Sequence, residues 1–82
     1  MTSPQNTHTI TVYSTTSCPY CHMVKDFLDA KGVPYRDMNV GIDRAAAMEM
    51  VKKSGQMGVP VIDIDGNIVV GFRPDAIEKL IA

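Results

Sequence analysis

The spacing of hydrophobic and polar residues in the first half of the chain predicts a helix between two strands. Residues 8–13, HTITVY, are rich in β-branched and aromatic side chains, which favours a strand. From Pro19 to about Lys31 apolar residues recur at helical spacing, and a proline suits the first helical position because that N–H would be unpaired anyway. Gly32 ends the helix, and residues 35–40 predict a second, short strand. The predicted apolar face of the helix consists of Cys21, Val24, Phe27 and Leu28.

The second half predicts a helix, a hairpin and a last helix. Asp43 can cap a helix that has lysines near its end and Gly55 just after it, and both features suit a helix C-terminus. Residues 59–70, VPVIDIDGNIVV, read as two strands joined by an Asp-Gly turn, which is a strong hairpin signal. Pro74 begins the last helix, and its predicted apolar stripe consists of Ile77, Leu80 and Ile81.

The resulting order is β-α-β-α-β-β-α. The first three elements form a βαβ unit, whose right-handed crossover makes the first two strands parallel. The hairpin adds antiparallel strands, so the sequence predicts an α/β fold in which three helices flank a mixed four-stranded sheet. One domain is expected over residues 8–82, and the polar residues 1–7 are expected to form a flexible arm.

Composition narrows the classes of function. The chain has 82 residues, a net charge of −1 and no basic run, which argues against a nucleic-acid partner. Its apolar runs are too short to span a membrane. The polar N-terminal residues do not resemble a signal peptide, so we expect the protein in the cytoplasm. We also expect a monomer. In that reducing compartment, cysteines more often take part in catalysis or metal binding than in structural disulfides.

The two cysteines of the chain lie three residues apart, in the stretch TTSCPYCHMV. Cys18 falls at the predicted junction of strand and helix, where the partial positive charge of a helix N-terminus favours a thiolate. Cys21 lies one turn further along, on the apolar face, and should be shielded. This asymmetry suits disulfide exchange, in which Cys18 attacks a substrate disulfide and Cys21 then releases the product.

Two other chemistries use this spacing. The pentapeptide CPYCH fits covalent haem attachment, but that site needs an export route and an apolar pocket that a small sheet protein can hardly enclose. A structural zinc site needs four ligands, and the chain offers only His8 and His22 beside its cysteines. An iron–sulfur cluster bridged by Cys18 of two chains with outside thiols remains an alternative of another class, a binding module.

The chain resembles the glutaredoxin family. The tetrad CPYC after the first strand, the Val-Pro element at 59–61 and Gly71 before the last helix carry this resemblance, which extends over residues 8–81. It implies a thioredoxin fold and a dithiol–disulfide oxidoreductase without a metal or organic prosthetic group. The redox centre would be a Cys18–Cys21 disulfide, and glutathione would be a possible co-substrate.

The resemblance also implies roles for single residues. Cys18 would be the nucleophile and Cys21 the resolving cysteine. Pro60 would be a cis-proline facing the active-site disulfide, and the backbone of Val59 would pair with an extended substrate. Support of the active site would come from Pro19, Tyr20 and Pro60.

Two departures from the family point to its NrdH-redoxin branch. Glutathione-binding members usually carry a cation shortly before the first cysteine, where this chain has Thr15, Thr16 and Ser17. They also usually carry Gly-Gly-x-x-Asp before the last helix, where this chain has GFRPD, which resembles the NrdH branch. That branch is reduced by thioredoxin reductase and donates electrons to ribonucleotide reductase. Its usual tetrad, however, is not CPYC, and this chain also lacks the tryptophan that often precedes GFRP. The candidate substrate-binding residues are Val59, Gly71, Phe72, Arg73 and Asp75.

The sequence therefore predicts reduction of protein disulfides or of glutathione mixed disulfides, with glutathione or thioredoxin reductase as the source of electrons. His22 and Lys25 can each act on the Cys18 thiolate or simply lie on the surface. Arg73 can hold a substrate carboxylate in place of the missing cation. The first strand offers no buried carboxylate, so the sequence names no internal base for Cys21.

Overall fold

A computed structural model describes residues 8–81, so the arm expected at residues 1–7 lies outside the described part. The order of elements is the predicted one. The elements are β1 (Ile10–Ser14), α1 (Pro19–Ala30), β2 (Arg36–Asn39), α2 (Arg44–Ser54), β3 (Val61–Ile64), β4 (Asn67–Val70) and α3 (Pro74–Ile81). Two boundaries differ from expectation: the second strand is shorter at both ends, and the hairpin begins at Val61, after Pro60, which has no N–H to donate to a strand ladder.

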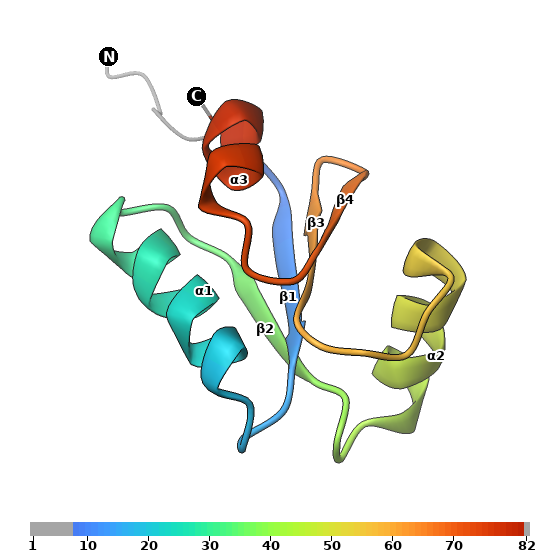
Figure 1. Ribbon diagram of the computed structural model, residues 1–82. Coiled ribbons are helices and arrows are strands. Elements are labelled where there is room, and N and C mark those ends of the chain that lie inside the picture. The colour runs from blue at the N-terminus through green and yellow to red at the C-terminus, as the bar shows by residue number, and fades with distance from the viewer. Residues whose placement is uncertain (1–7, 82) are drawn as a thin grey trace.

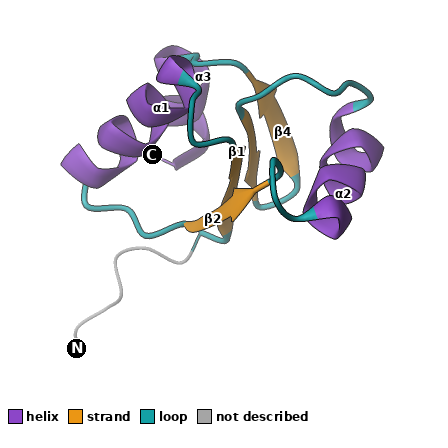
Figure 2. Cartoon of the chain, turned by 90° about the horizontal axis from the view of Figure 1, so that it is seen from below, coloured by secondary structure: helices purple, strands orange, loops and turns teal. Residues whose placement is uncertain are grey.

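The four strands form one mixed sheet in the order β2-β1-β3-β4. β1 and β2 are parallel, whereas β3 is antiparallel to both β1 and β4. Helices α1 and α3 cover one face of the sheet and α2 covers the other (Figures 1 and 2). This arrangement is a thioredoxin fold, as the resemblance implied.

Alternation along β1 divides the core between the two faces. Ile10 and Val12 point into the larger cluster under α1 and α3, whereas Tyr13 points into a smaller one with Met50 of α2. The larger cluster also contains six aliphatic residues from both helices and the hairpin, of which only Val69 is slightly exposed. They are Val24, Leu28, Ile62, Ile64, Val69 and Ile77. Helix α1 is therefore held by the main hydrophobic core.

Local signals act as the sequence predicted. The Asp43 carboxylate caps α2 by accepting a hydrogen bond of 3.1 Å from the Ala46 N–H. Gly55 ends the same helix with a φ of 75°, a left-handed conformation. In the hairpin, Asp65 and Gly66 have φ values of 54° and 92°, as a two-residue turn of type I′ requires.

The topology gathers four chain segments at one end of the sheet, seen along the strand direction. β1, β2 and β4 finish at this end, and β3 begins there. The β3–β4 hairpin, the start of β1 and the end of α3 lie at the opposite end of the sheet (Figure 1). Within residues 8–81, no helix has the length and apolar character needed to cross a membrane.

Candidate active site

Cys18 is the N-cap of α1 and Cys21 lies in the first turn of this helix. Cys18 has extended backbone angles, φ −100° and ψ 109°, and its Sγ accepts a hydrogen bond of 3.1 Å from the Cys21 N–H. Pro19 occupies the first helical position, as predicted. Both cysteines are free thiols; Cys18 is half-buried, whereas Cys21 has no exposed surface. The structure therefore presents one accessible thiol backed by one enclosed thiol.

The environment of Cys21 disfavours its thiolate. Burial, followed by the side-chain hydrogen bond with Cys18, raises the pKa of Cys21 to about 11. A hydrogen bond with the Thr15 backbone and the positive charge of Lys25 oppose this rise in the Cys21 pKa. Cys21 is therefore a protonated thiol at neutral pH in the reduced protein.

We expect alkylating reagents to modify Cys18 well before Cys21. With a pKa near 11, only about one Cys21 in ten thousand is a thiolate at pH 7, and its sulfur is enclosed. Limited treatment with iodoacetamide followed by peptide mass mapping measures the order of modification. Faster labelling of Cys21 would contradict the roles expected for the two cysteines.

Pro60 and Gly71 lie at the same end of the sheet as the cysteines. The Val59–Pro60 bond is cis, and Pro60 is buried. Because Tyr13 pairs with Val61, the register places Pro60 beside Ser14, four residues before Cys18. The Gly71 N–H donates a hydrogen bond of 2.8 Å to the Pro60 carbonyl, which joins the segments that flank β3 and β4. Val59 is half-buried.

The segment before α3 combines a packed aromatic ring with exposed charged residues. The Phe72 ring lies edge-on to that of Phe27 in α1, with centroids 6.0 Å apart and planes at 76°. Arg73 and Asp75 are exposed, and Asp75 lies in the first turn of α3. Phe72 therefore belongs to the margin of the core and links this segment to the helix that carries both cysteines.

Comparison with known proteins identifies the family. The family model described as Glutaredoxin matches residues 10–69, most of the chain. The chain belongs to the glutaredoxin family. Members of this family are thiol–disulfide oxidoreductases, and this is the class of activity of the chain.

Two curated relatives and one solved structure illustrate the similarity to this family. An uncharacterized glutaredoxin-like 8.6 kDa protein of the rubredoxin operon of Clostridium pasteurianum is 49% identical, covering 88% of this chain and 96% of that protein. Glutaredoxin 3 of Escherichia coli is 37% identical, covering 76% and 75%. The solved structure of the glutaredoxin-like NrdH-redoxin from Escherichia coli is 30% identical, with a TM-score of 0.78, and covers 89% and 95%.

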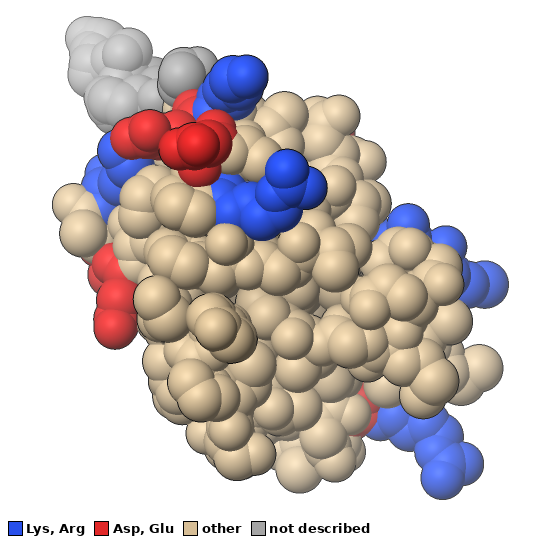
Figure 3. All heavy atoms as spheres, viewed as in Figure 1, with Lys and Arg blue, Asp and Glu red and all other residues tan. Residues whose placement is uncertain are grey.

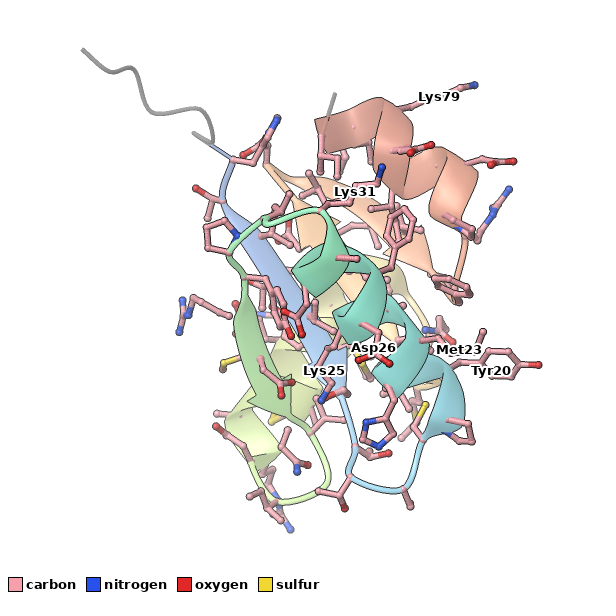
Figure 4. All side chains as sticks on the ribbon, turned by 90° about the vertical axis from the view of Figure 1, so that its left-hand side faces the viewer. Tyr20, Met23, Lys25, Asp26, Lys31 and Lys79 are labelled. Atoms are coloured by element: carbon pink, nitrogen blue, oxygen red, sulfur yellow. The ribbon has the colours of Figure 1, made fainter. Side chains whose placement is uncertain are left out.

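In this glutaredoxin the side chains of α1 project in two directions. Tyr20 is 61% exposed, and Figure 4 shows it with Met23 on the side of the helix away from Lys25. The His22 ring donates from Nε2 to the Thr16 carbonyl at 3.1 Å, because a carbonyl can only accept. His22 thus ties the first turn of the helix to the preceding loop.

Lys25 belongs to a polar cluster that the sequence did not predict. Its Nζ lies 3.0 Å from Asp37 Oδ2, in β2, and 3.5 Å from Ser14 Oγ, at the end of β1. Ser14 Oγ also donates a hydrogen bond of 2.8 Å to Asp37 Oδ1. The carboxylate that contacts Lys25 and Ser14 therefore comes from β2, not from β1. The parallel register pairs Asp37 with Val12, and the Asp37 side chain reaches Ser14, two residues further along β1.

The described residues include no metal-binding cluster. Among residues 8–81, no three His, Cys, Asp or Glu side chains are grouped so that they could hold a metal ion. The family needs no prosthetic group, because a disulfide that forms and breaks carries the electrons.

Proposed function

We propose that this glutaredoxin reduces disulfides of proteins in the cytoplasm, as a monomer, and that thioredoxin reductase supplies its electrons more efficiently than glutathione does. The observation that carries this proposal is the absence of a cation before Cys18, where Thr15, Thr16 and Ser17 stand. Glutathione presents two carboxylates, and its usual site in the family answers them with a lysine or arginine at this point.

The reaction needs both cysteines. The Cys18 thiolate attacks one sulfur of the substrate disulfide, and the other sulfur leaves as a thiolate and takes up a proton. Cys21 then loses its proton to water and attacks Cys18 Sγ, which releases the second substrate sulfur and forms the Cys18–Cys21 disulfide. Two electrons thus pass to the substrate. The Val59 backbone, next to Pro60, offers hydrogen-bonding groups to an extended substrate chain.

Features near Phe72 and Arg73 also favour a protein substrate. Phe72 stands where a second glycine would allow the backbone of glutathione to approach closely, and its ring is fixed against Phe27. On the face of the molecule seen in Figures 1 and 3, charged side chains lie mostly around the margin and the middle is free of them. An exposed ion pair is worth only about 0–1 kcal/mol, so the missing cation weakens glutathione binding without forbidding it. Arg73 at the N-terminus of α3 can still hold one carboxylate.

The chain is similar both to glutaredoxins and to NrdH-redoxins, so the comparisons are compatible with either reductant. One relative supports the proposal. The solved NrdH-redoxin of Escherichia coli is described as glutaredoxin-like with a thioredoxin-like activity profile. By analogy, a ribonucleotide reductase is one candidate recipient of the electrons. We expect a reduction potential between the glutaredoxin range of about −200 to −230 mV and the thioredoxin value of about −270 mV.

The test compares two reductants on one disulfide substrate. NADPH consumption is followed with thioredoxin reductase, and then with glutathione and glutathione reductase, and kcat/KM is determined for each. We expect the higher value with thioredoxin reductase. A preference of about tenfold for glutathione, or about 1.4 kcal/mol of transition-state stabilisation, would overturn the proposal.

The variant Arg73→Ala then tests the segment before α3. The substitution removes the exposed guanidinium, so we expect weaker glutathione-dependent activity with little change in the intrinsic reactivity of Cys18. An unchanged kcat/KM with glutathione would return Arg73 to the role of a plain loop residue. Lys79→Ala, an exposed change near the end of α3, is the matched control.

A further inference from the structure

The polar cluster of Lys25, Asp37 and Ser14 has no part in the steps described so far. Ser14 is only 2% exposed, and the Lys25 side chain only 18%, so the ion pair is largely withdrawn from water on the Lys25 side. Each of the three side chains contacts the other two within 3.5 Å. Two acceptors from different strands thus fix the position of the Lys25 ammonium group.

The cluster lies beside Cys21. Lys25 is four residues after Cys21 in α1, so the two side chains share one face of the helix. The Cys21 thiol bonds to the backbone of Thr15, and Lys25 Nζ reaches the side chain of Ser14, the residue before it. The two side chains therefore end at neighbouring residues, Thr15 and Ser14, where β1 leaves the sheet.

We propose that Lys25, held in place by Asp37 and Ser14, is a positioning residue that accelerates the second step of the reaction by favouring the Cys21 thiolate. This inference rests on the proposed function, because it assigns Lys25 to the release of product and not to the first attack by Cys18. A cation beside an enclosed thiol stabilises its anion most where water is excluded.

Few other charged groups can affect the same step. The titratable groups that act on Cys21 are Cys18 and Lys25. In the mixed disulfide, Cys18 carries no charge. Asp37 reaches Cys21 through Lys25, whose charge it partly offsets. The segment 55–60 has no charged residue, and Tyr13 of β1 faces the opposite side of the sheet.

Two opposing effects set the expected size. An opposite charge at close range changes the acid dissociation constant of a thiol by about ten- to a thousandfold. The less acidic thiolate is also the stronger nucleophile, with a Brønsted coefficient of about 0.4–0.5, which returns roughly half of the loss on a logarithmic scale. Removal of the Lys25 charge should therefore slow the second step by about three- to thirtyfold at pH 7.

The experiment follows both steps in single turnovers with dithiodipyridine, an uncharged disulfide that releases one absorbing thiopyridone in each step. In Lys25→Met we expect the first release to be unchanged and the second to slow as stated, by a factor that stays constant from pH 6 to 9, because Cys21, with a pKa of about 11, is mostly protonated throughout this range with or without Lys25. Lys25→Arg should retain most of the second rate. Asp37→Asn removes the offsetting charge, while its single amide oxygen can still accept from Lys25 Nζ, so it should speed the second release.

Controls separate this inference from the proposed function. Lys31→Met removes another lysine paired with a carboxylate, that of Glu78, and should change neither step. If the unmodified protein releases only one thiopyridone, the proposed function fails. If it releases two but Lys25→Met slows both steps equally or matches the unmodified rates, or if Lys25→Arg is as slow as Lys25→Met, the role of Lys25 is refuted. Should Lys25→Met fail to fold, slower second release in Asp37→Asn would refute it.

Discussion

Replacing Cys18 with serine is expected to abolish all disulfide reduction by this glutaredoxin, whichever reductant is supplied. Cys18 is the accessible thiol of the pair, and a hydroxyl in its place cannot form the mixed disulfide. Loss of a nucleophile that no neighbour can replace should lower kcat/KM by at least about a thousandfold. Cys21 is enclosed and protonated at neutral pH, so it cannot take over the first attack.

The matched variant Cys21→Ser should behave differently. It keeps Cys18 at the N-cap of α1, so it should form a stable mixed disulfide that mass spectrometry detects as one added substrate group. It should then fail to release the product from a protein disulfide. Disulfide reduction by Cys18→Ser, or repeated turnover of a protein disulfide by Cys21→Ser, would contradict the assigned roles.

The second large effect concerns stability. Leu28→Ala should lower the free energy of unfolding by about 2–5 kcal/mol, because it leaves a cavity in the main hydrophobic core. Leu28 is fully buried between α1 and the sheet, in the cluster that includes Ile62 and Ile77. Native proteins have a total stability of only about 5–15 kcal/mol, so this variant should lose a large fraction of it. Urea unfolding followed by circular dichroism measures the change.

Met48→Ala on α2 is the control for this stability change. Met48 is 64% exposed, and surface substitutions usually alter the free energy of unfolding by less than about 0.5 kcal/mol. A loss below about 1 kcal/mol in Leu28→Ala would mean that the core around α1 rearranges to fill the space.

The order of elements could be predicted from the sequence because local chemistry decides each of them. Pro19 sets the start of α1, Asp43 caps α2, and the Asp-Gly turn fixes the hairpin. Strand ends were less predictable, since whether Val59 or Val61 begins a strand depends on the neighbour it pairs with. The placement of Cys18 as an N-cap followed from the same local signals.

Contacts between distant segments could not be read in this way. The cis bond before Pro60 was expected only through the family resemblance, because spacing alone also fits an ordinary edge proline. The cluster around Lys25 needs Asp37, which the register of two parallel strands places opposite Val12 and within reach of Ser14. The four-residue spacing of Cys21 and Lys25 indicates that their side chains share one face of the helix. From the sequence alone, however, Lys25 was related to Cys18.

The start of β1 and the end of α3 lie where they have a practical consequence. β1 begins and α3 ends at the end of the sheet that carries the hairpin, whereas Cys18 lies at the other end (Figure 1). A second domain attached before β1 or after α3 would therefore sit on the far side from the reactive sulfur. Fusion to a fluorescent redox reporter or to an affinity matrix through either end should leave the dithiol open to large substrates.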